Sequence, residues 1–79
     1  MGAQEALIRE LPGSAERVRR LFWRDPEFRT VCADFRDALQ AATTFEALDS
    51  SEGARAEQYR RMAAELLAEA TEMLEVERT

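Results

Sequence analysis

The sequence predicts an all-α fold, in which a long antiparallel helical hairpin follows one or two short helices and forms a dimeric helical bundle. Ala, Leu, Glu and Arg dominate the composition, and all four residue types favour helices. The two Pro and three Gly residues occur at only a few points, which divide the chain into segments. Within the two longest segments, apolar residues recur at helical spacing. We expect residues 1–79 to form a single helical domain.

Residues 1–13 form an N-terminal segment whose apolar stretch is interrupted by Pro12 and Gly13. Ser14 follows directly, and serine is a favoured N-cap because its hydroxyl can accept a hydrogen bond from a free backbone N–H. The sequence therefore predicts a short helix within residues 14–24.

The first long helix is expected over residues 26–48. Asp25 can cap it, and Pro26 suits its first position because the N–H that proline lacks would be unpaired there. Glu27 adds a negative charge at the positive end of the helix dipole. Together these three residues form a strong helix start.

A second long helix is expected over residues 52–76, after a tight turn at residues 49–53 that contains Ser50, Ser51 and Gly53. One of the two serines would cap this helix. Each long helix would span ~35 Å at about 1.5 Å per residue. A turn this short forces its two helices to lie antiparallel, which predicts a helical hairpin.

Each long helix carries an apolar stripe. The first stripe contains Phe28, Val31, Cys32, Phe35, Ala38, Leu39, Ala42 and Phe45. The second contains Tyr59, Met62, Ala63, Leu66, Leu67, Ala70, Met73 and Leu74. Both stripes are about 120–140° wide, broader than the seam of a two-stranded coiled coil, so the hairpin contact leaves apolar surface uncovered. A second copy of the chain would cover part of it, which predicts a homodimer. The remainder would be covered by the N-terminal region, through Leu11, Val18, Leu21 and Phe22.

The residue types that are missing exclude much chemistry. The chain contains no His and no Lys, so it lacks the usual general base at neutral pH, the commonest metal ligand, and the amine of Schiff bases and Walker A motifs. We therefore expect no enzyme activity, no catalytic residue, no cofactor and no metal site. The apolar runs fall far short of the ~20 residues that span a bilayer, so no membrane contact is expected. The single Cys and the lack of a signal-peptide pattern indicate a cytoplasmic location.

Two features have both a structural and a chemical interpretation. Cys32 lies in the middle of the first stripe, which favours a core cysteine over a redox or catalytic thiol, because a reactive thiolate needs a basic partner and some exposure. Glu65, Glu69 and Glu72 lie along one side of the last helix. They favour a solvated face over a metal site, because di-iron bundles use a Glu-x-x-His motif that this chain cannot supply.

Basic and aromatic residues gather around Asp25. The candidate interaction surface consists of Arg17, Arg19, Arg20, Trp23, Arg24 and Arg29. Trp23 points about 120° away from the apolar side of its short helix, so it lies at the edge of the core or outside it. It would contact a second copy or a partner, pack over the helix corner, or line a small-molecule site, and Trp is enriched at interface hot spots. Arg19 or Arg20 could stack on its ring.

Glu72, Glu75 and Glu77 lie near the end of the last helix, where the helix dipole disfavours acids. Antiparallel pairing would place them beside Arg24 and Arg29, with the other arginines of the candidate interaction surface close enough to join. We predict an Arg–Glu cluster at the open end of the hairpin.

The expected function is a small non-catalytic protein–protein interaction module, such as an accessory or regulatory subunit, whose protein partner is unknown. The alternative is a nucleic-acid or nucleoid-associated factor that uses the Arg/Trp patch. The net charge of −5 argues against nucleic acid, because such binding relies on neutralising phosphates. The charge is also uneven, with a net +1 over residues 1–36 and a net −6 over residues 37–79.

Residues 17–75 resemble the YdcH family of small bacterial helical-hairpin proteins of unknown function. The resemblance rests on RLFWRDPEFRTVCADFRDALQAATTFEALDS, a Gly-containing turn and RRMAAELLAEATEMLE, and its most specific element is DPEF at residues 25–28. The family usually has Lys or another polar residue and then Leu-Asp midway along the first long helix, where this chain has DALQ at residues 37–40. The resemblance implies an all-α hairpin and brings no activity with it.

Overall fold

The computed structural model describes residues 2–48 and 53–78. Within these ranges the chain forms four α-helices, one turn of 3-10 helix and no strand, which confirms the all-α prediction. The elements are α1 (Ala3–Glu10), the 3-10 turn (Pro12–Ser14), α2 (Ala15–Arg24), α3 (Pro26–Ala47) and α4 (Gly53–Arg78). The predicted turn at residues 49–53 lies outside the described residues except for Gly53, which begins α4.

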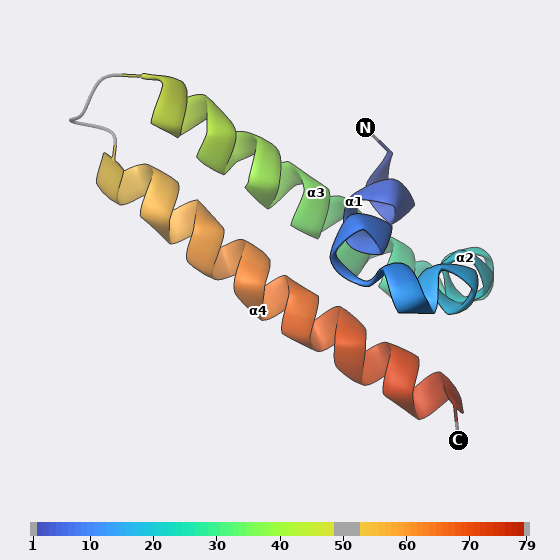
Figure 1. The fold of residues 1–79 in the computed structure, drawn as a ribbon. Helices are drawn as coiled ribbons and strands as arrows, with labels where there is room; N and C mark the ends of the chain where they lie inside the picture. Colours follow the sequence, from blue (N-terminus) through green and yellow to red (C-terminus); the bar gives the residue numbers. More distant parts are fainter. Residues whose placement is uncertain (1, 49–52, 79) are drawn as a thin grey trace.

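The two long helices lie side by side and run in opposite directions (Figure 1). The molecule is elongated, with a longest extent of 45 Å. α1 and α2 pack over the part of α3 that follows its N-terminus, with Arg9 of α1 lying beside Thr43 and Thr44, and leave the end of α3 uncovered (Figure 1). Residues 41–47 of α3 and 53–62 of α4 form a two-helix arm. At the opposite end, called here the open end, α2 lies near the last turns of α4.

The core lies where α1, α2 and α3 meet. Its largest fully buried side chains are Leu7 of α1, Val18 of α2, and Phe28 and Cys32 of α3. The buried residues that α4 contributes to this cluster are Ala63, Ala70 and Leu74. The four residues expected to cover the stripes, Leu11, Val18, Leu21 and Phe22, all pack in or against it. The apolar stripes predicted from the sequence thus face inward along most of their length.

The junction between α2 and α3 forms as the sequence predicts. Oδ1 of Asp25 accepts hydrogen bonds from the backbone N–H groups of Glu27 at 2.9 Å and Phe28 at 3.4 Å. Pro26 occupies the first turn of α3. An aspartate cap of this kind satisfies N–H groups that have no partner within the helix. The cap fixes where α3 begins, and with it the position of Phe28 in the core.

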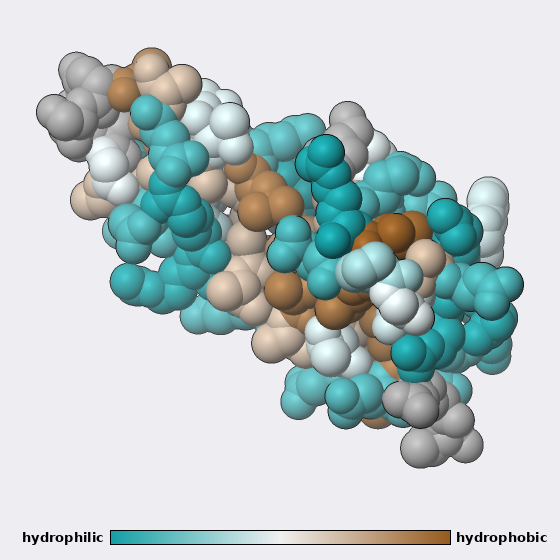
Figure 2. Space-filling model, viewed as in Figure 1, coloured by the Kyte–Doolittle hydropathy of each residue, from teal (hydrophilic) through white to brown (hydrophobic). Residues whose placement is uncertain are grey.

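One local prediction is wrong. Ser14 does not cap α2 with its side chain, because the chain enters α2 through the 3-10 turn, and its Oγ instead accepts from Nη2 of Arg17 at 2.9 Å. Met62, on the stripe of α4, is 47% exposed, in agreement with the prediction that the hairpin contact leaves apolar surface uncovered. The stripe is wider than the contact that α3 offers, so its outer edge faces solvent. Figure 2 shows apolar side chains along the line between α3 and α4, with hydrophilic side chains on either side.

Candidate interaction surface

Trp23 lies outside the core, on the last turn of α2. It is 77% exposed, and Arg19 precedes it by one helical turn, which places both on one face of the helix. Arg19 makes no ion pair with any residue that the structure describes. Neither Arg19 nor Arg20 makes a cation–π contact with Trp23 in the part of the chain that the structure describes, and Arg20 is engaged with Glu77 of α4. The exposed face of α2 therefore presents one unpaired cation and one uncovered aromatic ring.

The predicted Arg–Glu cluster forms around a single glutamate. Oε1 of Glu77 accepts from Nε of Arg20 at 3.3 Å and from Nη1 of Arg24 at 3.4 Å. Both arginine side chains are more than half exposed, whereas that of Glu77 is 13% exposed. The cluster joins α2 to the last turns of α4. It closes the open end on one side.

Arg29 does not join this cluster, and its role was not predicted. Its Nη1 donates to the backbone carbonyl oxygens of Phe22 at 2.8 Å and Trp23 at 3.2 Å. These carbonyls end α2 and have no partner within the helix, so a cation from α3 satisfies them. Arg29 thereby holds the last turn of α2, with Trp23 on it, against the first turns of α3. No local pattern signals this contact, since it depends on the angle between the two helices.

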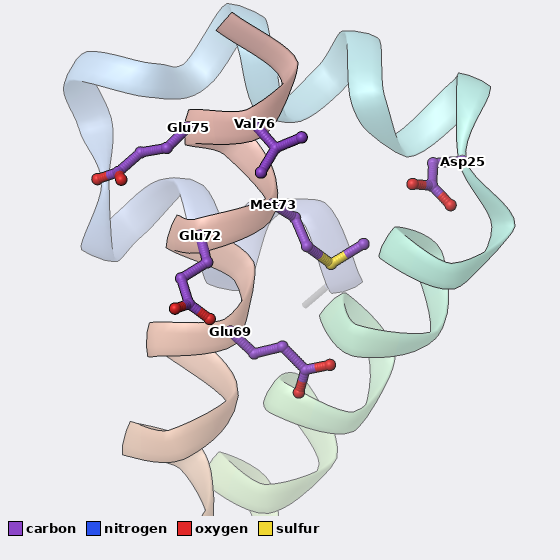
Figure 3. A pocket seen from close by; sticks show the side chains of 6 residues that line it. All are labelled: Asp25, Glu69, Glu72, Met73, Glu75 and Val76. Atoms are coloured by element: carbon purple, nitrogen blue, oxygen red, sulfur yellow. The ribbon is translucent and has the colours of Figure 1, made fainter. Parts of the chain in front are cut away.

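A groove with an apolar floor and acidic flanks runs along α4 at the open end (Figure 3). Its volume is about 690 Å³, and it is lined by Asp25, Glu69, Glu72, Met73, Glu75 and Val76. Met73 is half-buried, and its thioether points toward α3 (Figure 3). Val76 is 73% exposed. We call this feature the open-end groove.

The glutamates of the open-end groove keep their charges unpaired by any residue that the structure describes. Glu69, Glu72 and Glu75 make no ion pair with any residue in the described ranges, although the sequence predicts arginine partners for the last two. Four arginines of the candidate interaction surface are engaged elsewhere: Arg20 and Arg24 with Glu77, Arg29 with the end of α2, and Arg17 with Ser14. Since α4 also ends here, its dipole adds to the negative potential. The groove is an apolar surface in a negative field.

A second groove lies midway along the hairpin, between α3 and α4. It measures about 430 Å³, and its lining is Asp34, Asp37, Ala38, Ala41, Tyr59, Met62 and Leu66. We call it the hairpin groove. Asp34 makes no ion pair in the part of the chain that the structure describes, whereas Asp37 pairs with its neighbour Arg36 at 3.1 Å.

Cys32 is fully buried in α3. Burial raises the pKa of its thiol from 9.0 to about 11, because the thiolate would lose its hydration. The thiol therefore stays protonated at neutral pH, and a nucleophile of this kind would be both inaccessible and inactive. The structure supports the interpretation of Cys32 as a core residue.

Other features bear on ligands. Among the described residues, no three His, Cys, Asp or Glu side chains come close enough together to hold a metal ion, and Glu65, Glu69 and Glu72 do not form such a group. In the same residues, no helix has the length and apolarity needed to cross a membrane.

Comparison with known proteins found no matching family model, no matching curated protein and no matching solved structure. The resemblance to the YdcH family stays a prediction.

Proposed function

We propose that the protein is a small non-catalytic interaction module, such as an accessory or regulatory subunit, that works as a homodimer and contacts a protein partner. The observation that carries this proposal is the placement of exposed apolar side chains at the open end. Trp23 and Val76 are the two most exposed large hydrophobic residues in the described ranges. They lie at the same end of the molecule, because their neighbours Arg24 and Glu77 pair across α2 and α4.

Two features explain why such a surface favours association. The arm is only two helices thick, and apolar side chains stay visible along its seam (Figure 2). A domain of 9.0 kDa would typically expose ~4,900 Å², and this chain exposes 5236 Å². Exposed Trp residues are enriched at interface hot spots, where the partner excludes water. The dimeric bundle expected from the sequence would cover part of this surface.

The alternative, a nucleic-acid factor, receives less support. Of the candidate interaction surface, Arg17, Arg20 and Arg24 contact side chains of their own chain, and Arg29 holds the end of α2. Unpaired glutamates lie at the same end and would repel phosphates. Gel-shift measurements with DNA and RNA at low salt test it. A salt-dependent shift would favour this alternative.

Sedimentation equilibrium over about a hundredfold range of concentration tests the homodimer. We expect a monomer–dimer equilibrium with a fitted mass approaching twice 9.0 kDa. A monomer at every concentration would overturn the homodimer. Affinity capture from the native host, compared between the wild type and a Trp23→Ala variant, tests the partner. A partner that is lost with the variant supports the proposal, and capture that is equal for both contradicts it.

A further inference from the structure

The open end carries two surfaces that complement each other in shape and charge. We propose that Trp23 and Arg19 of one copy dock on the open-end groove of a second copy, with the indole on Met73 and Val76. The guanidinium of Arg19 lies against the carboxylates of the groove. The inference rests on the proposed homodimer and names the contact that forms it.

The first surface is the exposed face of α2. Trp23 and Arg19 share this face, and neither is engaged through its side chain by a described residue of its own chain. The helix that bears them is joined to the rest of the molecule by Arg29, which donates to its last carbonyls, and by the pairs of Arg20 and Arg24 with Glu77. A side chain on a fixed helix loses little freedom on docking, which improves affinity.

The second surface is the open-end groove. Its volume of about 690 Å³ accommodates an indole. Met73 offers a thioether, which makes favourable contacts with aromatic rings, and Val76 offers an exposed aliphatic side chain. Glu69 and Glu72 lack partners within the described residues, so a guanidinium that arrives from outside would gain charge-assisted hydrogen bonds there.

The occupant is a second copy rather than the same chain. Asp25, two residues after Trp23, already lines the groove, yet Trp23 is 77% exposed and does not enter it. Because both surfaces lie at the same end, a two-fold axis beside that end would bring each Trp23 to the other copy's groove, and the contact would form twice. The net +1 of residues 1–36 and the net −6 of residues 37–79 favour the same pairing.

Charge also favours this contact over one through the hairpin groove. Two hairpin grooves facing each other would bring together two copies of Asp34, which makes no ion pair within the described ranges. The open-end contact instead brings Arg19 to Glu72. Two docked indoles supply about 300–500 Å² of apolar area, short of the ~1,200–2,000 Å² of a standard interface. We therefore expect a dimer of micromolar rather than nanomolar affinity.

Trp23 is the sole tryptophan of the chain, so its fluorescence reports this contact directly. Dilution of the wild type should shift the emission to longer wavelength as the indole becomes hydrated, along the same curve as the change in sedimentation mass. Trp23→Ala should raise the dimer dissociation constant by at least about 30-fold. At concentrations where the wild type is already monomeric, the variant should keep the thermal stability of the wild type. Met62→Ala, in the hairpin groove, is the matched control and should leave the dimer intact.

Charge reversal tests the pairing of the two surfaces. Arg19→Glu and Glu72→Arg should each weaken the dimer, because each leaves like charges facing one another. An equimolar mixture of the two variants should associate again, since every contact in the mixed dimer regains opposite charges. Failure of the mixture to associate would overturn the charge pairing on which this contact rests.

The outcomes separate this inference from the proposed function. If the dimer survives Trp23→Ala, the open-end contact is rejected and the homodimer remains. The same conclusion follows, with the hairpin groove as the contact, if Met62→Ala dissociates the dimer and Trp23→Ala does not. A wild type that stays monomeric, with an emission maximum independent of concentration, rejects both.

Discussion

The half of the hairpin beside α1 and α2 buries large side chains. The arm buries alanines, and its two aromatic rings stack on each other while partly exposed. In the first half, Phe28 and Cys32 are fully buried in the core cluster. In the arm, the rings of Phe45 and Tyr59 stack with centroids 5.5 Å apart and planes 5° apart. Buried apolar area sets most of the stability, so the first half should hold the fold together. The arm is held by fewer contacts and keeps apolar surface exposed.

Phe28→Ala should have the largest effect on stability. The substitution removes a fully buried ring from the point where α1, α2 and α3 meet, and should lower the free energy of unfolding by about 3–5 kcal/mol. Phe45→Ala removes the same side chain from the arm, where the ring is only half-buried, and should cost about 1–2 kcal/mol. Urea unfolding followed by circular dichroism measures both. Equal losses would show that the arm contributes as much as the core.

Cys32 should make the core sensitive to alkaline pH. Folding raises the pKa of its thiol from 9.0 to about 11, so the folded protein holds the proton more tightly than the unfolded chain does. The resulting stability is fully present below about pH 9 and is lost as the pH rises toward about 11.

Urea midpoints for the wild type and for Cys32→Ala, compared across this range, measure the effect. The wild type should lose more stability on going from neutral to alkaline pH than the variant does. If stability falls with pH equally in the wild type and the variant, the predicted effect of Cys32 is contradicted, because all other titrating groups are common to both proteins.

Asp25→Ala should have a smaller effect, at the boundary between α2 and α3. It leaves the N–H groups of Glu27 and Phe28 without their acceptor and should cost about 1 kcal/mol. Asp34→Ala, also on α3 but exposed and within the helix, is the matched control. Its unfolding midpoint should stay close to that of the wild type, and a loss as large as that of Asp25→Ala would argue against a specific capping role.

The parts of the fold that could be predicted are those that local pattern determines. The start of α3 depends on Asp25 and Pro26, which act through neighbours two or three residues away. α1 was harder to predict, because eight residues seldom form a stable helix alone, and this one depends on burying Ala6 and Leu7 in the core. Ser14 was mispredicted for a similar reason: a capping preference does not reveal that its hydroxyl accepts from Arg17 instead.

The candidate surface divides in the same way. Helical periodicity along α2 predicted Trp23 at the edge of the core or outside it, and the structure places it outside. The open-end groove was not predicted, because its charge depends on which glutamate forms ion pairs with the arginines. Glu77 takes two of them, Arg29 turns to backbone carbonyls, and Glu72 is left unpaired within the described residues. These pairings depend on the angle at which α2 packs on the hairpin, and residue spacing in the sequence does not determine that angle.

Replacing both Arg20 and Arg24 with Gln should have the smallest effect on stability. Both side chains are exposed, and exposed ion pairs contribute only about 0–1 kcal/mol each. The loss should shrink further at high salt, which screens such pairs. Arg36→Gln, which breaks the exposed pair with Asp37, is the control for a loss of charge alone.

The same double variant should affect association more than stability. With glutamine at positions 20 and 24, the ion pairs with Glu77 no longer hold α2 against α4, so Trp23 would be less firmly placed for docking. We therefore expect a dimer dissociation constant several-fold above that of the wild type, measured by sedimentation, with an almost unchanged unfolding midpoint. An unchanged dissociation constant would mean that Arg29 alone orients the end of α2. The arm should be indifferent to this variant, because its own pairs, Arg60 with Glu46 and Glu57, lie at the other end of the hairpin.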